Sequence, residues 1–171
     1  AFLGVAFSFG IPMAFAAAQE GVSGLGWALF AVNLVWVVAY DTEYAMVDRD
    51  DDVKLGIRTS ALTFGRFDVA AVAACYVVYV AGMAWIGHAL AFGASYWAGL
   101  AIAVVLAGYH VWIIRTRDRA ACFSAFLGNH WLGFVIFASF GSYQAARDYT
   151  GEEAVSVRQL ATAAGYFDAE N

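Results

Sequence analysis

The sequence predicts an all-α fold, a polytopic transmembrane helical bundle of about five spans. Three observations lead to this class: the chain is 63% hydrophobic, only 13% of its 171 residues are charged, and its mean hydropathy is +0.67. Soluble domains are usually about 45–50% apolar and about 25% charged. The composition therefore predicts an integral membrane protein whose main surroundings are the lipid bilayer.

Five apolar segments account for the predicted spans. Each is close to the ~20 residues with which a helix crosses a bilayer, and they run roughly over residues 1–18, 24–41, 69–90, 93–114 and 123–145. Pro12 lies inside the first segment and should kink it, which neighbouring helices can tolerate in a membrane. The chain thus divides into a transmembrane region, residues 1–146, and a polar tail, residues 147–171.

The polar tail has one local signal. Thr150 and Glu153 have the spacing of a capping box, which predicts a short soluble helix over about residues 152–164. No chemistry is evident in this segment.

Basic residues predict the orientation of the spans. Seven of the nine Lys and Arg residues fall in two linkers, residues 42–68 between the second and third spans and "RTRDRAA" between the fourth and fifth. Alternating spans place both linkers on the same side of the membrane. The positive-inside rule assigns that side to the cytoplasm.

Two classes of function are disfavoured by composition. The sequence pI of about 4.9 argues against a nucleic-acid partner, because such proteins need a basic surface. Cys75 and Cys122 are the only cysteines and form no C-x-x-C pair, so neither a disulfide framework nor a thiol metal site is supported.

Six acids and one base lie between residues 41 and 52, directly after the second span. If that span continues as a helix, Asp41, Asp48 and Asp52 fall within roughly 40° of one another on one face. Asp51 lies at the edge of this face, whereas Asp50 points to the opposite side. Like charges one turn apart destabilise a helix unless a cation compensates them.

A hard divalent cation is the natural compensator. Mg²⁺ prefers oxygen ligands and is commonly held by one or two carboxylates together with substrate phosphates. The neighbouring Arg49, Lys54 and Arg58 could contact the remaining phosphate oxygens. Spacing alone leaves two readings about equally supported: a carboxylate–Mg²⁺–diphosphate site, or a solvated charged loop at the end of a helix.

A family resemblance narrows this choice. The stretch "YDTEYAMVDRDDDVKLGIRTSALTFG" closely resembles the second aspartate-rich motif of the UbiA family of intramembrane prenyltransferases. The stretches "LGVAFSFGIPMAFAA" and "RDRAACFSAFLGNHWLG" also resemble that family, in particular its 4-hydroxybenzoate polyprenyltransferase branch. The resemblance covers about residues 1–143 and implies the C-terminal five helices of a nine-helix fold.

The resemblance implies a function and a site. The function is transfer of a polyprenyl group from polyprenyl diphosphate to the ring of 4-hydroxybenzoate in ubiquinone biosynthesis, with Mg²⁺ as cofactor, in the bacterial inner membrane with the acidic motif on the cytoplasmic side. The motif positions Asp48 and Asp52 as the catalytic metal ligands. Further candidates are Asp41 and Asp51 for the metal, and Arg49, Lys54, Arg58 and Tyr44 for the substrate.

The chain departs from the family in one large respect. The first motif, of the type N-D-x-x-D-x-x-x-D, is not found in it, so we expect a piece of a longer protein that is inactive alone. Three alternative functions stay open: a UbiA-type enzyme with another aromatic acceptor, a CDP-alcohol phosphotransferase, whose D-G-x-x-A-R stretch is also not found, and a membrane cation transporter. A transporter would have no need of the basic residues among the acids, and its ion site usually lies near mid-bilayer.

Overall fold

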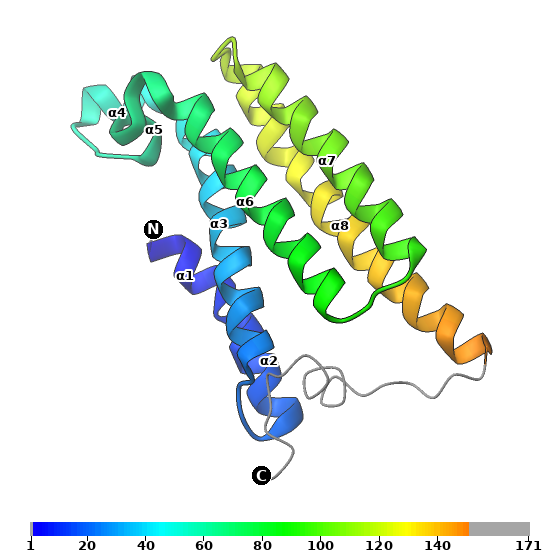
Figure 1. The fold of residues 1–171 in the computed structure, drawn as a ribbon. Helices are drawn as coiled ribbons and strands as arrows, with labels where there is room; N and C mark the ends of the chain where they lie inside the picture. The colour runs from blue at the N-terminus through cyan, green and yellow to red at the C-terminus, as the bar shows by residue number, and fades with distance from the viewer. Residues whose placement is uncertain (1, 151–171) are drawn as a thin grey trace.

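The computed structural model describes the backbone of residues 2–150 and the side chains of residues 3–141, and all regular secondary structure in this range is helical (Figure 1). The helix predicted over residues 152–164 lies outside the described residues. The elements in chain order are α1 (Phe2–Ser8), α2 (Gly10–Gln19), α3 (Gly24–Val47), α4 (Arg49–Leu55), α5 (Ser60–Phe64), the 3₁₀ turn η1 (Gly65–Phe67), α6 (Asp68–Ala89), α7 (Ala94–Ile114) and α8 (Arg119–Thr150).

Four stretches are long and apolar enough to cross a membrane: Gly24–Val47, Ser60–Ala89, Ala94–Ile114 and Arg119–Gly141. They overlap the second to fifth predicted segments, with ends that differ by up to nine residues. The first segment forms a shorter apolar stretch, Leu3–Gln19. The prediction of an all-α, multi-span membrane protein is thus confirmed.

The first apolar segment breaks between α1 and α2 at Phe9. The physical cause is Pro12, which has no N–H to donate to the carbonyl of Ser8 and whose ring clashes with that carbonyl. The helix resumes at once, since the Met13 N–H donates to the Phe9 carbonyl at 3.2 Å. The freed turn is tied to α3, because Asn33 Nδ2 donates to Ser8 Oγ at 2.9 Å.

The four long helices form a closed bundle. α3 packs on α6, α6 on α7, α7 on α8 and α8 on α3, while α1 and α2 lie against α3. Large apolar side chains remain exposed on the outside of the spans, for example Val77, Ile102 and Val105. In water such surface would be costly, whereas in lipid it needs no cover.

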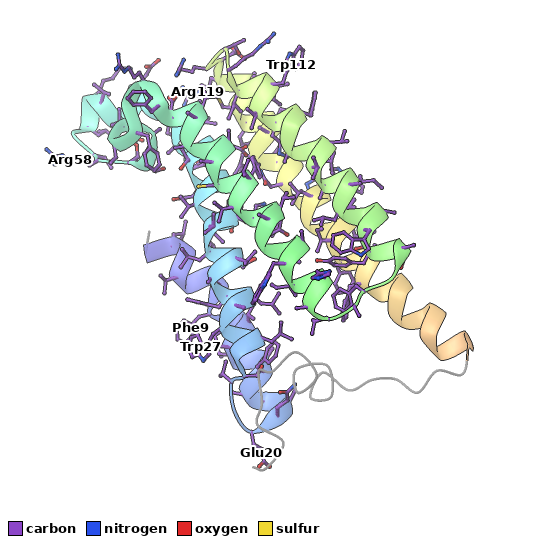
Figure 2. All side chains as sticks on the ribbon, in the orientation of Figure 1. Phe9, Glu20, Trp27, Arg58, Trp112 and Arg119 are labelled. Atoms are coloured by element: carbon purple, nitrogen blue, oxygen red, sulfur yellow. The ribbon has the colours of Figure 1, made fainter. Side chains whose placement is uncertain are left out.

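The two basic linkers lie at the same end of the bundle. In Figure 1, α4 and α5 occupy the end at which α7 turns into α8, and the α6–α7 turn lies at the other end. Figure 2 shows Arg58 and Arg119 toward the α4–α5 end and Glu20 at the opposite end. The fold therefore brings residues about 60 positions apart in sequence to one edge of the membrane protein.

Candidate functional site

The acidic stretch continues α3 almost without interruption. α3 ends at Val47, and Asp48 is the single residue between α3 and α4. The Asp48 N–H still donates to the Tyr44 carbonyl at 3.3 Å, and the Asp52 N–H donates to the Asp48 carbonyl at 2.8 Å. Asp48 and Asp52 therefore stay one helical turn apart on the same side of the chain.

A left-handed turn folds the next segment back over α4. Gly56 has φ +68°, a backbone conformation that favours glycine, and its N–H caps α4 at the Asp52 and Val53 carbonyls. The Ile57 N–H then donates to the Asp52 carbonyl at 3.0 Å. This turn brings Arg58 and the residues after it against the acidic face.

The result is a cavity of about 620 Å³ at the cytoplasmic edge predicted for the bundle, which we call the edge cavity. Acidic, basic, hydroxyl and apolar side chains line it together, namely Val38, Asp41, Tyr44, Ala45, Asp48, Asp52, Arg58, Thr59, Ser60, Thr63 and Phe64. Five of the eight residues predicted for the site are thus brought together: Asp41, Tyr44, Asp48, Asp52 and Arg58.

Three oxygen atoms of this cavity are buried without a hydrogen-bond partner in the described part of the chain: Asp52 Oδ2, Thr59 Oγ1 and Ser60 Oγ. Thr59 is the residue before α5, yet its side chain makes no capping bond. An unpaired buried polar atom costs about 1–3 kcal/mol. Three of them in one cavity are therefore the signature of a site that a polar ligand completes.

The donor set fits a hard cation with phosphate. The candidate ligands are carboxylate and hydroxyl oxygens, which suit Mg²⁺ better than softer metals. Among the described residues, no three His, Cys, Asp or Glu side chains converge closely enough to hold a metal by themselves. A cation here would take one or two carboxylates and complete its shell from phosphate or water.

The other three predicted residues face different partners. The Arg49 guanidinium donates to Asp68 Oδ2 at 2.6 Å. Lys54 pairs with Asp51 at 3.3 Å, and Arg119 reaches Asp51 at 3.0 Å. Hydrogen bonds from Arg119 and Lys54 hold the pKa of Asp51 below its usual range. Asp51 therefore stays ionised at neutral pH, and these ion pairs weaken only when acidification protonates it.

Arg119 also touches the predicted metal ligands. Its Nη2 lies 3.4 Å from Asp48 Oδ1, although Arg119 begins α8 and follows Asp48 by 71 residues. A cationic guanidinium beside Asp48 offsets part of the charge that accumulates on this face. Sequence patterning used Arg119 only to assign the orientation of the spans.

Asp68 joins the two linkers behind the site. Its carboxylate is fully buried and accepts hydrogen bonds from Arg49, from the Val69 N–H at 2.7 Å, and from Nε and Nη2 of Arg117 at 3.1 and 2.7 Å. Arg117 itself has φ +56°, a left-handed conformation unusual for arginine. The buried carboxylate thus fixes the α7–α8 turn against the start of α6.

A second polar cluster lies inside the bundle and was missed by sequence reasoning. It joins one side chain from each long helix, Glu43 on α3, Tyr76 on α6, His110 on α7 and Asn129 on α8. All four are buried. A carboxylic acid on the side of the α3 helix opposite Asp41 was the available signal, because such a side chain must find partners within the bundle.

A series of aromatic rings in contact leads from the edge cavity to the interior of the bundle. Tyr44 packs on Phe126 at a centroid distance of 5.0 Å, Phe126 lies 6.3 Å from Tyr40, Tyr40 5.6 Å from Trp36, and Trp36 5.4 Å from Tyr79. We call these five residues the aromatic row. Its α3 members are spaced four residues apart and so share one face.

The aromatic row ends at a second cavity of about 450 Å³. Its walls are apolar and aromatic apart from Asn33 and include Phe15, Leu29, Trp36, Tyr79, Met83, Tyr96, Gly133 and Phe137. The described chain therefore holds a polar cavity at the membrane edge and an apolar cavity deeper in the bundle, with aromatic side chains between them.

Comparison with known proteins places this geometry in a family. The profile of the UbiA prenyltransferase family matches residues 1–133. The chain is 60% identical over 143 residues to a 4-hydroxybenzoate octaprenyltransferase of Burkholderia multivorans, which aligns 84% of this chain and 50% of the relative. Enzymes of the same name from Burkholderia orbicola and Ralstonia nicotianae are 62% and 58% identical, with 81% and 80% of this chain and 48% and 47% of the relative aligned.

The chain spans about half the length of the curated relatives it matches. No solved structure matches it. Residues 1–133, which the family profile matches, include all residues that line the edge cavity, the aromatic row and most residues that line the apolar cavity. The chain belongs to the UbiA prenyltransferase family.

Proposed function

We propose that the chain forms about half of a membrane enzyme that transfers a polyprenyl group from polyprenyl diphosphate to the ring of 4-hydroxybenzoate, in ubiquinone biosynthesis. The observation that carries the proposal is the edge cavity, which Asp41, Asp48 and Asp52 line together with Thr59 and Ser60, whose hydroxyls have no hydrogen-bond partner in the described part of the chain. The names of the relatives support the acceptor.

The residues of the edge cavity divide into two roles. Asp48 and Asp52 would hold Mg²⁺, and Asp41, in the same cavity, and Asp51, next to Asp52 in the chain, are further candidate ligands. Arg58, Thr59 and Ser60 donate hydrogen bonds to diphosphate oxygens, and Tyr44 lies against the first carbons of the chain. Arg49 forms an ion pair with Asp68, and Lys54 forms one with Asp51. These two basic residues could therefore contact the diphosphate only after their ion pairs break. Mg²⁺, when bound, neutralises the diphosphate as a leaving group.

The reaction breaks one bond and makes another. The allylic C–O bond breaks, and the diphosphate leaves with the electron pair. A ring carbon ortho to the phenol hydroxyl forms the new C–C bond, and loss of its proton restores aromaticity. The apolar walls beyond Tyr44 exclude water, which would otherwise capture the electron-poor allylic carbon.

The aromatic row and the apolar cavity accommodate the polyprenyl tail. From Tyr44 to Trp36 the α3 helix rises about 12 Å, so the row covers the first isoprene units and the cavity receives later ones. The tail enters the cavity from lipid, which is as apolar as the cavity walls. Fit to these walls therefore decides which tail lengths are accepted, while the polar contacts of the diphosphate supply most of the affinity for the donor.

In this proposal the edge cavity lies on the cytoplasmic side of a bacterial inner membrane. Arg58 and Arg119 from two different linkers lie at the cavity end of the bundle (Figure 2), which agrees with the positive-inside rule. The diphosphate and 4-hydroxybenzoate would both enter from that side.

The proposal is tested with the full-length protein that contains this chain. Purified protein with octaprenyl diphosphate, 4-hydroxybenzoate and Mg²⁺ should yield prenylated 4-hydroxybenzoate, and chelation should stop the reaction. If product forms only with another aromatic acceptor, 4-hydroxybenzoate is not the substrate. If the protein conducts cations and yields no prenylated product, it is a transporter. We also propose that the 171-residue chain alone is inactive, and prenyl transfer by it would refute that part.

Loss of the unpartnered hydroxyls should weaken donor binding. T59V and S60A are each expected to raise KM for polyprenyl diphosphate about tenfold, because a hydrogen bond to a charged group contributes about 1.5–3 kcal/mol. Steady-state kinetics in detergent would measure it. T116V is the matched control, because Thr116 lies in the other linker, where its hydroxyl donates to the Ile113 carbonyl and accepts from the Asp118 N–H. An unchanged KM in both T59V and S60A would exclude diphosphate contact by these hydroxyls.

A side chain at Gly133 should shorten the tail that the apolar cavity accepts. A Cβ there would lie 2.7 Å from Cη2 of Trp36, so G133A must push the indole into the cavity. We expect the ratio of octaprenyl to geranyl transfer to fall about tenfold, the scale of one misfitting methylene. G108A is the control, because a Cβ at Gly108 meets nothing within 4 Å. The same ratio in G133A and wild type would place the tail elsewhere.

A further inference from the structure

The buried cluster of Glu43, Tyr76, His110 and Asn129 has no role in the proposed chemistry. It lies within the spans, and Glu43 has no ion-pair partner among the described residues. Polar side chains inside a membrane protein are costly unless partnered. The presence of four such side chains in one buried cluster therefore needs a physical explanation.

Asn129 is the centre of the cluster, and all its hydrogen-bonding capacity is used. Its Oδ1 accepts from Trp36 Nε1 at 2.8 Å and from the Tyr76 hydroxyl at 2.9 Å. Its Nδ2 donates to Glu43 Oε2 at 2.7 Å and to the Ala125 carbonyl at 3.0 Å. The Trp36 N–H can only donate and the Ala125 carbonyl can only accept, so these two contacts determine which side of the amide carries Oδ1 and which carries Nδ2.

Tyr76 extends the cluster to the other two helices. Its hydroxyl lies 2.9 Å from both Glu43 Oε1 and Asn129 Oδ1 and 3.0 Å from His110 Nδ1. Because it has one proton, it donates to one of the two oxygens at a time. One oxygen atom on α6 thus contacts side chains of α3, α7 and α8. Because the cluster has a partner on each long helix, rotation of α3, α6 or α8 breaks several of these hydrogen bonds at once, and rotation of α7 breaks the contact between Tyr76 and His110.

The geometry of α3 links this cluster to both cavities. Glu43 follows Asp41 by two residues, about 200° around the helix, and Trp36 precedes Glu43 by seven residues, which returns to nearly the same side. One side of α3 therefore presents Trp36 and Glu43 to Asn129, while another presents Asp41 and Asp48 to the edge cavity.

We propose that Glu43 and Asn129 are positioning residues that fix the rotation of α3, so that its carboxylates face the edge cavity and the Trp36 indole forms the wall of the apolar cavity. The inference rests on the proposed function. Apolar side chains of similar size could pack the same helices, but they would permit several rotations. Hydrogen bonds at 2.7 to 2.9 Å from a saturated amide specify one.

An amide–carboxyl exchange across the Glu43–Asn129 contact tests the proposal in the full-length protein. N129D replaces the donor by an oxygen and sets two carboxyl groups against each other. E43Q keeps the shape and both hydrogen-bonding partners. The double variant E43Q/N129D restores one donor and one acceptor in reversed order. Both N129D variants lose the bond to the Ala125 carbonyl, so recovery reports on the contact between α3 and α8 alone.

Mn²⁺ affinity by electron paramagnetic resonance is the first measurement, and kcat and KM for the donor are the second. N129D should weaken Mn²⁺ binding at least about tenfold, the scale of lost supporting contacts around a metal, and lower kcat. E43Q should stay within about threefold of wild type, and E43Q/N129D should recover most of the loss. T42V is the control, because the buried Thr42 hydroxyl donates only along its own helix, to the Val38 carbonyl at 2.7 Å.

Two results would overturn the proposal: Mn²⁺ affinity and kcat unchanged in N129D, or no recovery in a folded E43Q/N129D. If N129D fails to fold, E43L supplies the same comparison with E43Q. D52N separates this inference from the proposed function. If D52N binds Mn²⁺ as wild type does, the metal site itself is misassigned. If D52N loses Mn²⁺ and N129D does not, only the positioning role fails.

Discussion

Replacement of Asp48 or Asp52 by alanine in the full-length protein is expected to abolish prenyl transfer, with a loss of at least about a hundredfold. Substitution of supporting residues around a metal already costs about 10–100-fold, and these two side chains are the proposed ligands themselves. Asp52 carries a buried oxygen with no protein partner in the described residues. Its loss removes a group that contributes little to the fold and much to ligand binding.

The measurement is product formation across a Mg²⁺ titration, together with membrane fractionation. D48A and D52A should insert normally, because both residues lie beyond the end of the α3 span. D50A is the matched control: Asp50 is exposed, belongs to the same helical turn and points away from the cavity lining. Normal activity of D48A or D52A at limiting Mg²⁺ would rule out the assigned ligands.

The largest effect on stability is expected at Asp68, outside the edge cavity. D68A removes the carboxylate that pairs with both Arg49 and Arg117 and leaves two guanidinium groups without compensation. Removal of one partner of a buried pair costs about 3–5 kcal/mol. The arginine side chains are 30% and 41% exposed, so we expect a loss near about 3 kcal/mol, the lower end of that range.

Thermal unfolding in detergent would measure the loss at Asp68. K54A is the comparison, because it breaks an exposed pair with Asp51 that contributes at most about 1 kcal/mol. D68A should unfold at a clearly lower temperature than K54A and wild type. Equal midpoints for all three proteins would mean that the two linkers are held together by packing alone.

Sequence patterning predicted the spans well because the signal for a span is local. Apolar length and composition suffice to place a helix in lipid, and the predicted 24–41, 69–90 and 93–114 overlap the observed α3, α6 and α7. The break near Pro12 was also predictable, although it falls at Phe9, because proline disturbs the carbonyl four residues earlier.

The acidic face was predictable for the same reason. Asp41, Asp48 and Asp52 line one cavity because helical geometry carries across the single residue between α3 and α4. The contribution of Thr59 and Ser60 was not predictable, because it depends on how the Gly56 turn folds the chain back. The ion-pair partner of Arg49 was not predictable either, because Asp68 lies 19 residues away in the sequence.

The amino-acid sequence by itself determined the membrane class, the positions of the spans and the single face that carries the carboxylates. These follow from apolar length and from the period of the helix, both of which act over a few residues. Tertiary structure alone decided which charges pair, which oxygens stay unpartnered, and that Glu43, Tyr76, His110 and Asn129 meet. The contacts among these four residues join positions 33 to 86 apart in the sequence, and only the packing of four helices brings their atoms within hydrogen-bonding distance.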